Sequence, residues 1–156
     1  TIMEAPEVLA QRLFILSTTS RTTMIRSWPK LLSEFWSTMD FAPLLNVELG
    51  DKQAHLVLVD NPPQHLKGDF ILANDLAYTF EQAQLGEALT YSGVAVLAPK
   101  MFAGLENGKR PLAPLLKQAM QQQQVSAEKL QGIWVDVGTP ERLEQLDQQI
   151  IQGVFL

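Results

Sequence analysis

The chain has 156 residues, 46% of them hydrophobic and 19% charged, a balance typical of one globular domain with its own core. The absence of cysteine excludes disulfides, thiolate zinc sites and cysteine nucleophiles, and two histidines are too few for a multi-histidine metal site. A net charge of −5 argues against a nucleic-acid partner, because phosphates are neutralised by clustered Lys and Arg. No apolar run reaches the roughly 20 residues that span a bilayer, and the first residues lack the basic region of a secretory signal. We therefore expect no membrane partner and a cytoplasmic location.

The composition changes near Trp36. No acidic residue occurs from Val8 to Ser33, and ten of the twenty residues from Gln11 to Lys30 are Ser, Thr or Arg, with neither helical nor strand periodicity. Serine, arginine and leucine have many codons, so an excess of them is typical of a shifted reading frame. We therefore expect residues 1–35 to be a divergent or out-of-frame N-terminal segment, followed by a different unit over residues 36–156. A genuine extension with a partner of its own is the alternative.

Beyond Trp36 the pattern first predicts strands separated by turns. Asp40 is placed to cap a short helix that ends at Leu45. Runs rich in β-branched and apolar residues, bounded by Pro, Asn or Asp, predict strands over 54–59, 69–73, 77–80 and 89–97. Asn74-Asp75, between the second and third of these runs, indicates a β-hairpin turn.

Helical spacing appears in the last third of the chain. After Pro111 the apolar residues recur at i, i+3, i+4, i+7 and i+8, at Leu112, Leu115, Leu116, Ala119 and Met120. A strand is expected over 132–137, and Thr139 then caps a final helix with Pro140 in its first position and Gly153 as its stop. Strands that alternate with helices predict an α/β fold with a mixed sheet.

The most specific segment runs from Gly132 to Leu143. It places the carboxylate of Asp136 near the end of a strand, followed at once by Gly138 and the helix cap Thr139. Ligands of α/β sheets bind at the carboxyl ends of strands, helix N-termini attract anions, and an aspartate there can hold a Mg²⁺ that bridges phosphate oxygens. The alternative is that Asp136 only accepts hydrogen bonds from backbone amides of the turn.

This segment resembles the Trp-x-Asp-x-Gly-Thr signature of the sugar-1-phosphate nucleotidyltransferases, and in particular the bacterial N-acetylmuramate-1-phosphate uridylyltransferases. The other stretches that carry the resemblance are 55–63 with 68–70, 89–94, and 111–116 with 125–126, in the family's order from about Trp36 to Gly153. The resemblance implies a Rossmann-like nucleotidyltransferase fold with a mixed sheet, of which residues 36–156 are the C-terminal part. The N-terminal nucleotide-binding part is missing, since the first glycine is Gly50 and no Gly-rich loop exists.

The resemblance also implies the site. Asp136 would be one of two acidic Mg²⁺ ligands, and Glu34 stands where the other belongs. The residues implied to bind substrate are Gly68, Asp69, Thr90, Ser92, Gly93 and Thr139; no catalytic residue is assigned. The glycines would allow close approach to a sugar phosphate, although a turn or a strand irregularity explains them as well. A solvated loop carboxylate is the alternative for Asp69, and His65, in the same loop, shows no supporting partner.

The implied reaction is a Mg²⁺-dependent transfer from a nucleoside triphosphate to a sugar 1-phosphate, which yields a nucleotide sugar and pyrophosphate. UTP and N-acetylmuramate 1-phosphate, in peptidoglycan recycling, are the favoured pair. This chain alone is expected to be inactive, because the triphosphate-binding loop is absent. The alternative is a non-catalytic module that binds a sugar phosphate or another protein. Self-association is also expected, since half a sheet exposes an edge and an apolar face.

The frame hypothesis can be tested on the coding sequence upstream of the Trp36 codon, translated in all three frames. We expect another frame to encode a Gly-rich loop, a Pro-Lys pair and an Asn-Gly-Asp turn. If no frame encodes them, the N-terminal segment is genuine and the binding-module alternative gains.

Overall fold

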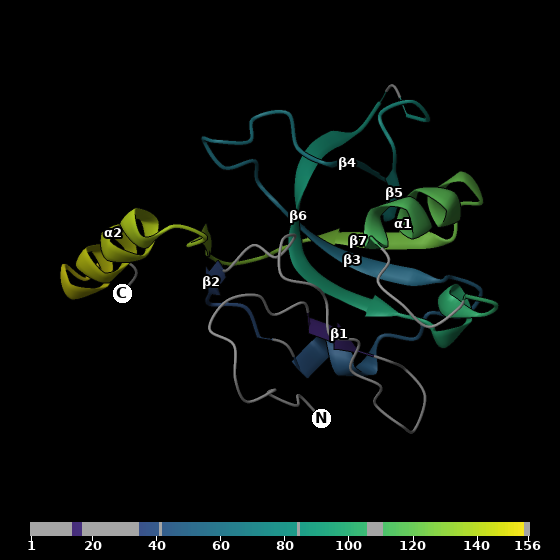
Figure 1. Cartoon of the computed structure of the whole chain (residues 1–156), viewed down its shortest axis with the longest axis horizontal. Coiled ribbons are helices and arrows are strands. Elements are labelled where there is room, and N and C mark those ends of the chain that lie inside the picture. Colours follow the sequence, from purple (N-terminus) through teal and green to yellow (C-terminus); the bar gives the residue numbers. More distant parts are fainter. Residues whose placement is uncertain (1–13, 17–34, 41, 84, 106–110, 155–156) are drawn as a thin grey trace.

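The computed structural model describes residues 14–16, 35–40, 42–83, 85–105 and 111–154 (Figure 1). The strands are β1 (Phe14–Leu16), β2 (Phe35–Ser37), β3 (Ala54–Val59), β4 (Phe70–Ala73), β5 (Leu76–Tyr78), β6 (Glu87–Leu97), β7 (Val125–Lys129) and β8 (Trp134–Asp136). The helices are the 3₁₀ turns η1 (Ala42–Asn46) and η2 (Pro99–Phe102), and the α-helices α1 (Leu112–Gln121) and α2 (Pro140–Ile151). Among the described residues, no helix is long and apolar enough to cross a membrane.

The long strand β6 organises the main sheet. It pairs in parallel with β1 and antiparallel with both β3 and β4, and the sheet has the order β1-β6-β3-β7-β5-β4. Because β4 returns to β6, the strands β6, β3, β7, β5 and β4 close a ring. Figure 1 shows the strong curve of β6. Parallel pairs (β1–β6, β3–β7) and antiparallel pairs occur together, so the predicted mixed sheet is confirmed. The Rossmann-like topology and the missing nucleotide-binding part stay predictions.

A bulge allows β6 to bend. Leu56 pairs with Ala95 but Leu58 pairs with Tyr91, so Ser92, Gly93 and Val94 together face the single residue Val57. Gly93 has a φ of 88°, a left-handed conformation that costs glycine little. The Ser92 hydroxyl donates to the Val57 carbonyl (2.7 Å) and accepts from the Val94 amide (3.1 Å), which replaces the ladder bonds that the bulge interrupts.

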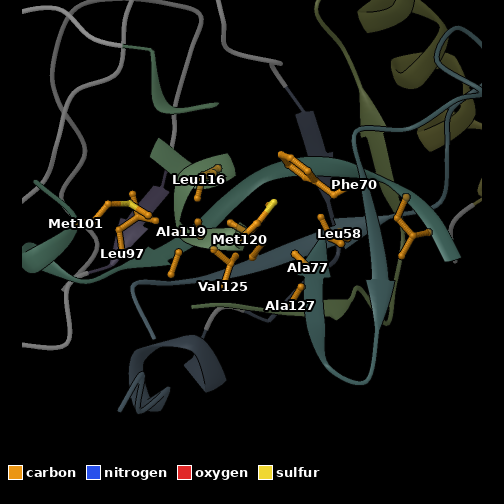
Figure 2. Packing of buried hydrophobic residues seen from close by; sticks show 14 residues of the cluster. Leu58, Phe70, Ala77, Leu97, Met101, Leu116, Ala119, Met120, Val125 and Ala127 are labelled. Atoms are coloured by element: carbon orange, nitrogen blue, oxygen red, sulfur yellow. The ribbon is translucent and has the colours of Figure 1, made fainter. Parts of the chain in front are cut away.

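The core fills both faces of the sheet. Because side chains alternate along a strand, Ala54, Leu56 and Leu58 of β3 point to one face and Val57 to the other. On the first face α1 packs Leu116, Ala119 and Met120 against the strands (Figure 2). On the second face the segment around η1 contributes Leu44 and Leu49.

Most of the predicted elements are confirmed. The strand over 54–59 is β3, and the hairpin turn is at Asn74 and Asp75, whose φ angles of 50° and 60° are those of a type I′ turn. Thr139 caps α2 through its side chain, and Gly153 ends that helix with a φ of 72°. Asp40 accepts from the Ala42 amide (2.9 Å) at the start of η1. The sequence did not predict β7, which pairs in parallel with β3.

Strands β2 and β8 form a small separate sheet, with Trp36 paired to Val135. Trp134 joins this sheet to the main one, because its indole N–H donates to the Ser92 carbonyl (3.1 Å) while its ring stacks on Phe35 at 6.1 Å between centroids. Helix α2 follows β8 and lies on the opposite side of the molecule from α1 (Figure 1). Strand β2 begins at Phe35, next to the boundary predicted between residues 35 and 36, and β1 lies before it in the main sheet. The division into two segments and the origin of residues 1–35 stay predictions.

Candidate functional site

The loop from Asn61 to Asp69, between β3 and β4, is held against the first residues of β6. The Asn61 amide nitrogen donates to the carbonyls of Ala88 (2.9 Å) and Leu66 (3.1 Å). Its amide oxygen accepts from the Thr90 hydroxyl at 2.8 Å. Asn61 therefore fixes the loop to β6 and sets the rotamer of Thr90, a residue predicted to bind substrate. Asn61 lies in the stretch 55–63 that carries the resemblance, but no role was predicted for its side chain, so this role was missed.

Asp69 is a bonded carboxylate at the end of this loop. Its Oδ2 accepts from the Tyr91 amide (2.8 Å), its own amide donates to the Leu89 carbonyl (2.8 Å), and its Oδ1 lies 3.0 Å from His65 Nε2. The prediction that His65 has no supporting partner is wrong, because the turn brings two side chains four positions apart together. Asp69 is likewise more than a solvated carboxylate, since it fixes the start of the bulged part of β6.

Both predicted glycines adopt left-handed conformations. Gly68 has a φ of 74°, and a Cβ at this position would lie 2.7 Å from the Leu89 carbonyl oxygen and 2.7 Å from Asn61 Oδ1. Gly93 is the left-handed residue of the β6 bulge. The turn and the strand irregularity that were the alternatives for these glycines are therefore present, and contact with a ligand stays a prediction.

Asp136 ends β8 with a carboxylate that is already hydrogen-bonded. Its Oδ1 accepts from the Gly138 amide (2.9 Å), and its Oδ2 accepts from Gln64 Nε2 (2.9 Å) and from the Arg142 guanidinium. The Asp136 side chain is 17% exposed and that of Arg142 is 35% exposed. The turn amide fits the alternative stated for Asp136. The ion pair with Arg142 was missed, although a basic residue in the first turn of a helix is a signal, because the helix dipole disfavours it there.

Thr139 and Ser92 use their hydroxyls within the fold. Thr139 Oγ1 accepts from the Arg142 amide at 3.3 Å, as an N-cap residue does. Ser92 is 1% exposed, and its hydroxyl is engaged in the bulge. The Ser92 carbonyl also accepts from the Trp134 indole, so contact of Ser92 with a substrate stays a prediction.

Several of the predicted residues come together at one corner, although they are far apart in the sequence. Gln64 connects the 61–69 loop to Asp136, and Trp134 connects β8 to Ser92. We call this set the loop corner: Asn61, Gln64, His65, Gly68, Asp69, Thr90, Ser92, Gly93, Asp136, Thr139 and Arg142. Loop residues, a strand bulge and a helix N-terminus meet there, and a helix N-terminus favours anions. The hydroxyls of Thr90, Ser92 and Thr139 are already hydrogen-bonded within the fold.

The described residues alone do not fit a Mg²⁺ ion. Glu34, predicted as the second metal ligand, lies outside them, and within the described ranges no group of three His, Cys, Asp or Glu side chains could hold a metal. Asp136, the one predicted ligand that is described, has an arginine on its carboxylate. Mg²⁺ requires near-octahedral oxygen ligands, and a guanidinium on the same carboxylate opposes it.

Tyr91 is the residue after Thr90, but its phenol cannot serve in acid–base chemistry. Burial raises the pKa of its phenol far above the ordinary value, so the hydroxyl stays neutral wherever the chain is folded. The ring packs against the core, and the hydroxyl finds no hydrogen-bond partner among the described residues. Tyr91 is therefore a core aromatic.

Comparison with known proteins supports the resemblance, although no family model matches the chain. Over 93 residues, 59% of this chain and 40% of the relative, it is 46% identical to the N-acetylmuramate alpha-1-phosphate uridylyltransferase of Neisseria meningitidis serogroup B. The chain thus spans well under half of that relative's length. The resemblance to the sugar-1-phosphate nucleotidyltransferases, over a C-terminal part, is confirmed.

A solved structure supports the resemblance at the level of the fold. The chain matches a crystal structure from Bacillus anthracis, described as a glucose-1-phosphate thymidylyltransferase in complex with a sucrose, with a TM-score of 0.56. The match covers 73% of this chain and 50% of that one. At 15% identity it shows a shared fold and nothing finer.

Gly68→Ala tests whether the loop corner depends on this glycine. The Cβ would overlap the Leu89 backbone and the residue would keep a left-handed φ, so we expect about 2 kcal/mol or more of lost unfolding free energy beyond the control. Gly50→Ala is the matched control, since Gly50 has a φ of 57° but nothing lies within 4 Å of its Cβ, and it should cost about 1–2 kcal/mol. Urea unfolding measures both; equal losses would contradict the close packing of Gly68.

Proposed function

We propose that this chain is the sugar-phosphate-binding part of a sugar-1-phosphate nucleotidyltransferase. The intact enzyme would join a nucleoside triphosphate and a sugar 1-phosphate into a nucleotide sugar and release pyrophosphate. The observation that carries this proposal is the 46% identity, over 93 residues, to an enzyme named for that reaction. The loop corner supports it, because residues implied by the resemblance from three separate stretches converge there.

In this reaction the phosphate oxygen of the sugar phosphate attacks the α-phosphorus of the triphosphate, and pyrophosphate leaves. Most of the rate acceleration in such transfers comes from positioning and charge stabilisation. The part of this chain would be to bind and orient the sugar phosphate. Asn61 and Asp69 would hold the loop and β6 in the binding geometry, and Thr90 Oγ1, which donates to Asn61, keeps acceptor capacity for a sugar hydroxyl.

N-acetylmuramate 1-phosphate, with UTP as donor, is the substrate pair that we propose, in peptidoglycan recycling. The relative's name is the support for this pair. The cytoplasm, where nucleoside triphosphates are held, is the proposed compartment.

Mg²⁺ is the cofactor that we propose for the intact enzyme, where it would neutralise the triphosphate charge. In this chain its ligands would have to be Asp136 and a second carboxylate, for which Glu34 is the candidate. Since the described residues do not fit the ion as they stand, this chain alone is proposed to be inactive. Its role is then binding without turnover.

Self-association is proposed as well, because α2 carries an exposed apolar face. Its exposed members are Leu143, Ile150, Ile151 and, just beyond the helix, Val154. Sedimentation velocity over a tenfold range of concentration should show a mass above that of one chain, which Ile151→Glu should lower. A single-chain mass throughout the range would exclude it.

Thermal unfolding with ligand tests the proposed function. N-acetylmuramate 1-phosphate at about 100 times its Kd should stabilise the chain by ~2.7 kcal/mol and raise Tm by roughly 5–10 °C. N-acetylglucosamine 1-phosphate, which lacks the lactyl carboxylate, and inorganic phosphate are the comparison ligands and should raise Tm less. With UTP and Mg²⁺ added, no pyrophosphate should form above the blank.

Two outcomes would contradict parts of this proposal. An unchanged Tm with every sugar phosphate would remove the binding function. Pyrophosphate release that is lost on Asp136→Ala would show that the chain alone is active.

A further inference from the structure

Arg142 lies at a position of α2 that is unfavourable for a cation, unless a nearby carboxylate compensates its charge. It is the third residue of α2, where the helix dipole is positive and acidic side chains are preferred. Its backbone amide donates to the cap residue Thr139, as expected, but its side chain turns back to Asp136, six positions earlier. The ion pair thus connects the start of α2 to the end of β8.

The negative charge of Asp136 is compensated by the groups around it. Both carboxylate oxygens accept hydrogen bonds, from the Gly138 amide, the Gln64 amide and the Arg142 guanidinium. Of these three donors, the guanidinium is the one that carries a full positive charge. The carboxylate is mostly buried, at 17% exposure, so that charge is only partly screened by water.

We propose that Arg142 takes the place of a divalent cation at Asp136 and keeps the carboxylate closed to such a cation. A metal ion could approach Asp136 only after the guanidinium leaves, because two positive groups on one carboxylate repel each other. Asp136 in this chain is thus part of an ion pair that fastens α2 to the loop corner. Because the cation is implied by the proposed nucleotidyltransferase activity, this inference rests on that function.

Mn²⁺ binding to the full chain, followed by the electron paramagnetic resonance signal of the free ion, tests the proposal without any enzyme assay. The wild-type chain and Asp136→Asn should bind Mn²⁺ equally weakly. Arg142→Gln removes the charge and keeps a polar side chain, and it should bind about tenfold more tightly or better. This gain should disappear in the double variant Arg142→Gln/Asp136→Asn.

Two control variants separate charge from hydrogen bonding. Gln64→Ala removes a neutral donor from the same carboxylate oxygen and should leave the Mn²⁺ affinity within about threefold of wild type. Arg142→Lys keeps the positive charge and should also stay near wild type. The near-ultraviolet circular dichroism of each variant verifies that it is folded.

Three results would overturn the proposal. One is wild-type Mn²⁺ binding that is lost on Asp136→Asn, a comparison that does not depend on any Arg142 variant. Another is an unchanged affinity in folded Arg142→Gln, and the third is a gain that survives Asp136→Asn. Failure of sugar-phosphate binding, by contrast, would show in the Tm measurement with no change in these Mn²⁺ titrations, so the two proposals fail separately.

Discussion

The ring of strands β6, β3, β7, β5 and β4 can close only if the sheet curves, and the eleven-residue β6 carries its bulge at Ser92-Gly93. The bend requires a left-handed residue, which glycine supplies, and replacement partners for the interrupted ladder, which the buried Ser92 hydroxyl supplies. An unpaired backbone group at this depth would cost about 1–3 kcal/mol. With Gly93 in the left-handed conformation and the Ser92 hydroxyl bonded to the backbone, the sheet closes on itself, and α1 covers one face of it. Replacement of either residue would therefore disturb the core and the site together.

The loop corner follows from the same bend. Thr90 lies just before the bulge and is fixed by Asn61, and the Ser92 carbonyl accepts the indole N–H of Trp134. In this way the small β2–β8 sheet, which ends in Asp136, is attached to the bulge of the main sheet. The contacts that hold the corner are mostly hydrogen bonds to backbone groups, which orient polar side chains with little freedom. Such preorganisation is what binding of a sugar phosphate requires, because less ordering remains to be done when the ligand arrives.

The sequence pattern predicted those elements whose conformation depends on residues nearby in the chain. The apolar run of β3, the Asn74-Asp75 turn and the Thr139 cap each depend on near neighbours in sequence, and each is confirmed. Strand β7 was missed because Val125-Ser126-Ala127-Glu128-Lys129 has weak strand propensity, and its pairing with β3 decides its state. The pairs His65–Asp69 and Asp136–Arg142 were missed for a related reason: a loop and a strand–helix turn bring them together. The resemblance named residues that do meet in space, but it did not show how many of their polar atoms the fold already uses.

An amide NMR titration of the full chain with N-acetylmuramate 1-phosphate shows whether the loop corner binds a sugar phosphate. We expect the largest saturable shifts at amides of the 61–69 loop and of residues 90–94, with smaller ones at 136–142. Saturable shifts confined to other parts of the described chain, or none at millimolar ligand, would contradict this expectation.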